Sequence, residues 1–145
     1  MDCFIEFAYN DESVFRRIYT LIEYIKIKKE LGKLDCEDST ILNFYKEEEI
    51  QYYWWPTEQE NREFWDKYYS LDNEQRYLLL MNKSWDLESV IDAIRTGEYI
   101  IIGVKVTAKG VGRLYYEPES YPYGGVQPLV ELIKPFDIEI IRVES

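Results

Sequence analysis

Tyrosine and carboxylate side chains that could bind a ligand or transfer a proton are concentrated in residues 115–128, "YYEPESYPYGGVQP". A carboxylate beside aromatic rings can have a raised pKa and act as a proton donor, and tyrosines can bind a ligand by stacking and hydrogen bonding. The pattern therefore indicates a cleft near residues 113–125 that binds a small molecule or serves an enzyme without histidine. The candidate residues are Arg113, Tyr115, Tyr116, Glu117, Glu119, Tyr121 and Tyr123.

A plainer interpretation of the same stretch is a connection between a strand and a helix. Gly124 and Gly125 allow a tight turn, and Pro128 is compatible with the first turn of a helix. Tyr115 and Tyr116 would end a strand, where neighbouring side chains point to opposite faces. This interpretation explains the glycines and prolines, and it leaves open whether Tyr121 and Tyr123 line a site or pack the loop onto the sheet.

A second aromatic cluster, "QYYWWP", occupies residues 51–56. On a strand, Tyr52 and Trp54 would face one side while Tyr53 and Trp55 would face the other. One face can pack in the core against helices. The other needs a cover, which we expect from within the chain; a homodimer or a partner protein is the alternative. Tyr52 and Trp54 are therefore further candidates for binding.

The chain of 145 residues contains no histidine, and this excludes several catalytic classes. Ser-His-Asp and Cys-His catalysis, histidine zinc sites and a histidine base all need the imidazole. Two cysteines cannot make a four-thiolate zinc site, and neither a calcium-loop pattern nor a Walker lysine motif is present. We expect no cofactor, no metal and no catalytic residues.

The net charge of −11 is unevenly distributed along the chain. Residues 1–75 contain 9 Lys/Arg and 18 Asp/Glu, and residues 76–145 contain 8 and 10. Nucleic-acid binding requires basic side chains that replace phosphate counterions, so we expect no nucleic-acid partner. An acidic, aromatic-rich chain suits a protein partner with a basic surface. Toxin-neutralising immunity proteins and acidic nucleic-acid mimics share this composition.

The remaining sequence features indicate a cytoplasmic protein. Cys3 and Cys36 are the only cysteines, which is weak evidence for an oxidising compartment. The first residues, "MDCFIEFAYNDES", lack the basic and apolar segments of a signal peptide, and no run approaches the length needed to cross a bilayer. We therefore expect reduced thiols and no membrane association.

Hydrophobic periodicity and start and stop signals predict most of the elements. A strand at 3–9 precedes a helix at 11–31, with an apolar stripe that includes Ile18, Leu21, Ile22 and Ile25. Strands at 40–45 and 50–55 form a hairpin around "KEEE". A helix at 58–70 begins at a capping box of Thr57 and Glu60. Residues 77–81 fit either a strand or a helix. Then follow a helix at 84–97 with the apolar stripe Leu87, Val90, Ile91 and Ile94, a hairpin of strands at 98–106 and 113–117, a helix from Pro128 and a strand at 137–144.

This order of elements predicts a single compact α+β domain over residues 1–145. The sheet would be mixed and mainly antiparallel, with helices packed on one face. If residues 77–81 form a strand, the chain contains two ferredoxin-like β-α-β-β-α-β halves, at about 1–83 and 77–145. The function that the sequence favours is a protein-interaction module without catalysis, immunity-like or regulatory; the alternative is the small-molecule site near residues 113–125.

Overall fold

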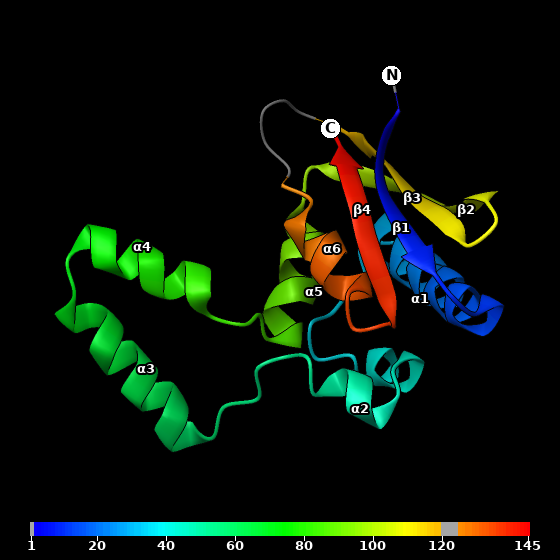
Figure 1. The fold of residues 1–145 in the computed structure, drawn as a ribbon. Helices are drawn as coiled ribbons and strands as arrows, with labels where there is room; N and C mark the ends of the chain where they lie inside the picture. Colours follow the sequence, from blue (N-terminus) through cyan, green and yellow to red (C-terminus); the bar gives the residue numbers. More distant parts are fainter. Residues whose placement is uncertain (1, 120–124) are drawn as a thin grey trace.

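A four-stranded antiparallel sheet with helices against one face organises the structure, which is a computed structural model that describes residues 2–119 and 125–145 (Figure 1). The strand order is β2-β3-β1-β4, so β1 lies between β3 and β4. The strands are β1 (Cys3–Tyr9), β2 (Tyr99–Ala108), β3 (Val111–Pro118) and β4 (Ile138–Glu144). The helices are α1 (Glu12–Glu30), the 3₁₀ helix η1 (Ser39–Phe44), α2 (Glu47–Ile50), α3 (Glu58–Ser70), α4 (Asn73–Asn82), α5 (Leu87–Thr96) and α6 (Gln127–Ile133).

The hydrophobic core lies between one face of the sheet and helices α1, α5 and α6. Alternation along the strands directs Ile5 and Phe7 of β1 and Leu114 of β3 to this face, where they are fully buried. The helices contribute the stripes that the sequence predicts, Ile18, Leu21, Ile22 and Ile25 from α1 and Leu87, Val90, Ile91 and Ile94 from α5. The predicted α+β domain with helices on one face is therefore confirmed, although its sheet is antiparallel throughout rather than mixed.

Local signals set the ends of several elements as the sequence predicts. Asp11 caps α1 by accepting a hydrogen bond from the Ser13 amide, and Gly32 follows the helix with a φ of 66°. Thr57 and Glu60 form the expected capping box of α3. The hairpin of β2 and β3 turns at Gly110, whose φ of 74° strongly favours glycine. These features depend on residues close in sequence, which is why they are predictable.

The predicted hairpin over residues 40–55 is wrong. The first segment forms η1, the "KEEE" run begins α2, and the residues after Ile50 form a turn. Two interactions favour the helical alternative. Asp38 accepts from the Thr40 amide at 3.0 Å, and the Glu49 carboxylate accepts from the Lys46 amide at 2.6 Å. Tyr45 and Tyr53 then enter the core, where both donate hydrogen bonds to the backbone of α6.

Residues 77–81 lie within helix α4, which Asp72 caps by accepting a hydrogen bond from the Gln75 amide. The two ferredoxin-like halves required a strand at this place, and that requirement is not met. The strands instead follow the order β-α-β-β-α-β once over the chain, with α1 and α6 as the two helices of that order and η1 to α5 added between α1 and β2. Helices α3 and α4 project away from the sheet and its covering helices (Figure 1).

Candidate functional site

Helices α3 and α4 form an arm, defined here as residues 57–83, that leaves the body of the protein and returns to it (Figure 1). No residue of the arm is buried. Arg76 of α4 holds the two helices together, because its guanidinium donates to the carbonyl oxygens of Tyr68 at 3.0 Å and Tyr69 at 3.1 Å. It also lies over both tyrosine rings. The arm is therefore a helical hairpin that lacks a core of its own.

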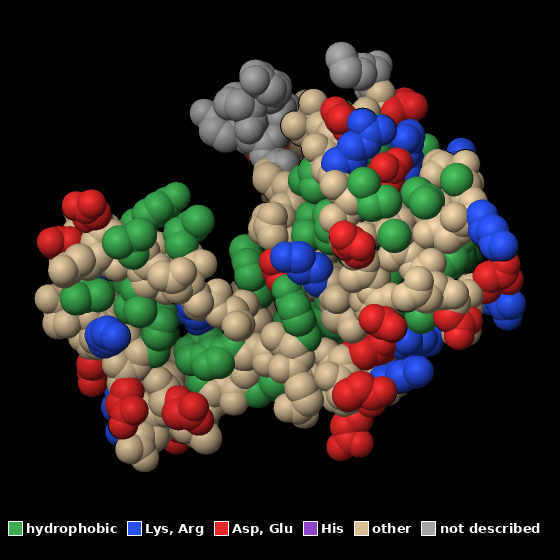
Figure 2. Space-filling view, in the orientation of Figure 1, with side chains coloured by type: hydrophobic (Ala, Val, Ile, Leu, Met, Phe, Trp, Pro, Cys, Tyr) green, Lys and Arg blue, Asp and Glu red, His purple; other side chains and the backbone are tan. Residues whose placement is uncertain are grey.

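The arm exposes a large apolar surface. Tyr69 retains 68% of its accessible surface and Met81 retains 64%. Figure 2 shows hydrophobic side chains gathered over α4. Apolar area of this kind is costly to leave in water, and exposed clusters of it mark interaction sites. The exposed apolar residues of the arm are Tyr69, Tyr77, Leu78, Leu80 and Met81.

The two chain segments that join the arm to the body contact each other at the base of the arm. The Trp54 amide donates to the Trp85 carbonyl oxygen at 3.0 Å. The Lys83 ammonium lies 4.4 Å from the centre of a Trp54 ring and 3.6 Å from a carboxylate oxygen of Asp86. Asp86 in turn caps α5 by accepting from the Ser89 amide at 3.0 Å. These contacts fix the direction in which the arm leaves the body.

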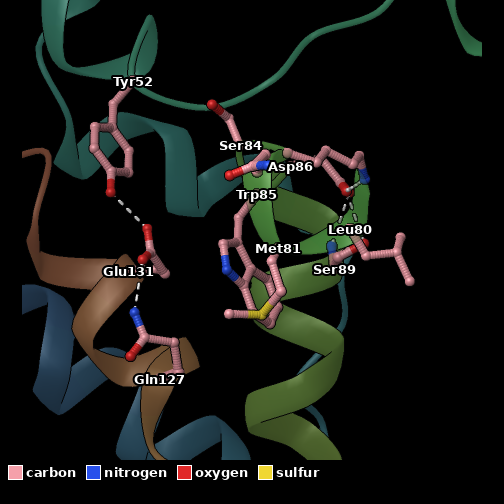
Figure 3. Close-up of a pocket in the computed structure, with 11 residues that line it drawn as sticks. Tyr52, Leu80, Met81, Ser84, Trp85, Asp86, Ser89, Gln127 and Glu131 are labelled. Carbon is pink, nitrogen blue, oxygen red and sulfur yellow. Dashed lines mark hydrogen bonds and ion pairs between the residues drawn. The ribbon is translucent and has the colours of Figure 1, made fainter. Parts of the chain in front are cut away.

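A cleft of about 750 Å³ lies between the arm and the body. Figure 2 shows the hollow between these two parts, and Figure 3 shows the residues of the cleft at closer range. Tyr52, Gln127 and Glu131 stand on one side of this view, and Met81 and Trp85 stand on the other. The lining residues are Tyr52, Leu80, Met81, Asn82, Lys83, Ser84, Trp85, Asp86, Ser89, Gln127 and Glu131.

The carboxylate of Glu131 is the most deeply placed charge of the cleft, since this residue is only 6% exposed. The Tyr52 hydroxyl donates to Oε2 at 2.6 Å, and the Gln127 amide donates to Oε1 at 2.8 Å (Figure 3). The Lys134 ammonium is 3.8 Å from Oε1. Burial, together with the hydrogen bond to this carboxylate, raises the pKa of Tyr52 well above its usual value. Tyr52 thus remains a hydrogen-bond donor at neutral pH.

Two other shielded carboxylates have much closer cationic partners. Glu49 is 8% exposed, and Arg17 donates to its two oxygens at 2.6 and 2.8 Å. Glu6 of β1 receives the Arg113 guanidinium at 2.7 Å and has Arg142 at 3.5 Å. In both cases an arginine of the chain compensates the charge. Glu131 differs because its two hydrogen-bond donors are neutral.

The candidate residues of strand β3 separate onto the two faces of the sheet. Arg113 and Tyr115 lie on the outer face, where the guanidinium is 3.9 Å from the Phe4 ring centre and Tyr115 meets that ring edge-on. Glu117 shares this face by alternation. Tyr116 points the other way and is buried, with its hydroxyl donating to the Glu144 carbonyl oxygen at 2.8 Å. Tyr116 therefore packs in the hydrophobic core.

The remaining predicted residues are also dispersed. The Glu119 amide donates to the Glu98 carbonyl oxygen at 2.9 Å, and Glu119 lines a small cavity of about 180 Å³ beside Lys29 and Tyr99. Tyr121 and Tyr123 lie outside the described residues. The described members of the 113–125 group are thus divided between the two faces of the sheet and its edge.

The second aromatic cluster, residues 51–56, lies beside the arm and contributes to its cleft. Tyr52 lines the cleft, whereas Trp54 lines a neighbouring cavity of about 490 Å³. The two do not share one strand face as predicted, because the segment is a turn. Tyr53 is covered within the chain, and Trp55 stays 47% exposed.

Sequence reasoning missed Glu131, Met81, Trp85 and Gln127. For Glu131 a signal is present, since it is the only charged residue within the apolar run "PLVELI" of residues 128–133. Burying a lone carboxylate among core residues costs free energy unless a hydrogen-bond donor or a cation pairs with it. The other three residues have no comparable signal, because their proximity depends on how the arm joins the body.

Within residues 2–119 and 125–145, no group of three or more carboxylate or cysteine side chains is placed to hold a metal ion. None of the helices described is both long enough and apolar enough to cross a membrane. No family model matches the chain, and no curated protein or solved structure matches it. The geometry of the arm and cleft must therefore support any functional conclusion.

Proposed function

We propose that this chain is a protein-binding module that holds a basic partner against the arm and the adjoining cleft. One observation carries the proposal: the arm contains no buried residue and yet exposes five large apolar side chains. Isolated helices of 13 and 10 residues are marginal in water, so packing against another surface would stabilise the arm. Apolar and aromatic residues of this kind supply the central contacts of protein interfaces.

The charge of the chain favours a basic partner over a second copy of itself. Helices α3 and α4 contain five carboxylates and three basic side chains, and the whole chain has a net charge of −11. Two such chains repel each other at long range, whereas a basic protein is attracted and steered toward the arm. A binding role also agrees with the absence of histidine from the sequence.

The test is affinity capture from the native cell with the wild-type chain and with the double variant Leu78→Ser/Met81→Ser. Both residues are exposed on α4, so their replacement leaves the body of the protein intact. We expect the wild type to retain a basic protein that the variant loses. The association rate of that complex should fall as salt concentration rises, because screening weakens the steering.

The matched control is Ile27→Ser/Leu31→Ser, which changes two similarly exposed apolar residues at the end of α1. This variant should retain the partner as the wild type does. Equal loss from both variants would show non-specific adhesion. A partner that binds all three proteins equally would show that the arm is not the interface, and either result would overturn the proposal.

A further inference from the structure

The cleft carboxylate lacks the type of partner that the other shielded carboxylates have. Glu49 and Glu6 each receive an arginine of this chain within hydrogen-bond distance. Among the described residues, Glu131 is hydrogen bonded by the neutral donors Tyr52 and Gln127, and Lys134 is 3.8 Å away. A carboxylate has about four acceptor positions, so Glu131 can accept further hydrogen bonds. A buried charge with incomplete compensation favours the approach of a cation.

Lys83, which also lines the cleft, does not pair with the Glu131 carboxylate. Lys83 is ion-paired with Asp86 at 3.6 Å and lies over the rings of Trp54 and Phe64. These contacts hold its ammonium at the base of the arm. Among the described residues, Lys134 at 3.8 Å is thus the cation that Glu131 has, and a cation within hydrogen-bond distance would have to come from a partner.

The remaining lining of the cleft suits a guanidinium group. Tyr52 and Trp85 provide aromatic surface, and Met81 provides a polarisable apolar contact. Ser84, Ser89 and the Gln127 side chain add hydrogen-bonding groups to the lining. A guanidinium is planar, weakly hydrated and able to pair with a carboxylate while it lies against an aromatic ring. An ammonium ion is more strongly hydrated and gains less from such a cleft.

We propose that the cleft receives an arginine side chain of the basic partner, with its guanidinium on the carboxylate of Glu131. This inference rests on the proposed function and adds the anchor residue that the partner contributes. The arm would cover the aliphatic part of that side chain through Leu80 and Met81. Arginine is common among the few residues that dominate interface affinity, and a deep pocket is its typical setting.

The test is a titration of the isotope-labelled chain with N-acetyl-arginine amide, followed by NMR. The probes for comparison are N-acetyl-lysine amide and the uncharged N-acetyl-citrulline amide. We expect saturable shifts of the Trp85 indole and Met81 methyl signals with the arginine probe, weaker binding of the lysine probe and none of the citrulline probe. Equal binding of arginine and lysine, or no saturable shift with arginine, would overturn the assignment.

Glu131→Gln preserves the shape and an acceptor oxygen but removes the charge, and it should weaken arginine binding about tenfold or more. Glu139→Gln, the same change at an exposed residue of β4, should leave binding unchanged. Met81→Ser, on the exposed arm, should weaken binding without affecting the body. Equal affinity of the Glu131 and Glu139 variants would overturn the inference.

The two proposals fail in different ways. If Glu131→Gln retains the captured partner at wild-type affinity while the Leu78/Met81 variant loses it, the arginine inference fails and the protein-binding function stands. If the arginine probe binds through Glu131 but no partner depends on the arm, the cleft recognises guanidinium groups and the proposed function fails. The inference, which places that arginine on a protein partner, then fails with it.

Discussion

Glu49 and Glu131 are equally shielded from solvent, yet they lie in different kinds of environment. Glu49 joins α2 to α1 through two hydrogen bonds from Arg17, and the guanidinium also lies 5.0 Å from the Phe136 ring centre. Glu131 opens onto a cleft and has neutral donors. The first carboxylate is therefore compensated by the fold, whereas the second has capacity for an external partner. The comparison shows that burial alone does not identify a functional carboxylate; the source of its compensating charge does.

The largest effect that this comparison predicts is the loss of Arg17. Arg17→Met should lower the free energy of unfolding by about 3 kcal/mol, because it leaves the buried Glu49 without a hydrogen-bonded cation. The measurement is urea denaturation followed by far-UV circular dichroism. The control is Arg16→Met, whose side chain is exposed and forms only a 3.9 Å pair with Glu12. Equal, small losses in the two variants would show that the Glu49 pair is not a stabilising element.

The stability that the Arg17–Glu49 pair provides should also depend on pH, with a smaller effect than the loss of Arg17. Burial raises the pKa of Glu49, but the Arg17 hydrogen bonds and the Lys46 amide outweigh it and hold that pKa below the ordinary 4.5. The stability from this pair is thus present above pH 4.5 and is lost as the pH falls through the lowered pKa. Denaturation curves at several pH values should show the gap between wild type and Arg17→Met narrowing in acid. A gap that stays constant would contradict this account.

Removing a neutral donor from the cleft should have a still smaller effect. Tyr52→Phe deletes the hydroxyl that donates to Glu131 and should lower the free energy of unfolding by about 1.5 kcal/mol. Tyr19→Phe, at an exposed position of α1, is the control and should be nearly neutral. If binding of the arginine probe improves in Tyr52→Phe, the cation takes over the acceptor position that the hydroxyl leaves. Unchanged stability would show that Glu131 does not depend on this donor.

The smallest change in stability is expected for Glu131→Gln. The substitution removes a buried charge that, among the described residues, is paired only with the Lys134 ammonium at 3.8 Å, and the glutamine still accepts one hydrogen bond. The free energy of unfolding should therefore change by less than about 1 kcal/mol. Urea denaturation beside Arg17→Met measures the difference directly. A loss as large as that of Arg17→Met would mean that Glu131 is a structural carboxylate like Glu49.

Much of the body could be predicted because its signals are local. The stripes of α1 and α5, the capping box of α3 and the hairpin of β2 and β3 each depend on residues within a few turns or strand positions. The segment 40–55 could not be predicted in this way. Its aromatic residues satisfy the β pattern, but the contacts of Glu49 with Arg17 and of Tyr45 with the Leu132 carbonyl oxygen favour short helices. Such contacts join residues far apart in sequence.

The candidate site likewise contains residues that could be predicted from the sequence and residues that could not. Tyr52 and Trp54 are recognisable from the sequence as aromatic residues that need a cover, and both lie next to the arm. The group around residues 113–119 is equally rich in suitable side chains. The pleat of β3 nevertheless sends Tyr115 and Tyr116 to opposite faces, so these two side chains do not line the same space.

The sequence by itself determined the α+β class, most of the helices and strands, the acidic charge and the absence of histidine chemistry. Periodicity, capping and composition depend on neighbouring residues or on residue counts. Only the tertiary structure decided that α3 and α4 stand out as an arm and that Glu131 faces a cleft at its base. The reason is that the Tyr52–Glu131 hydrogen bond joins side chains 79 positions apart. No local pattern encodes that proximity.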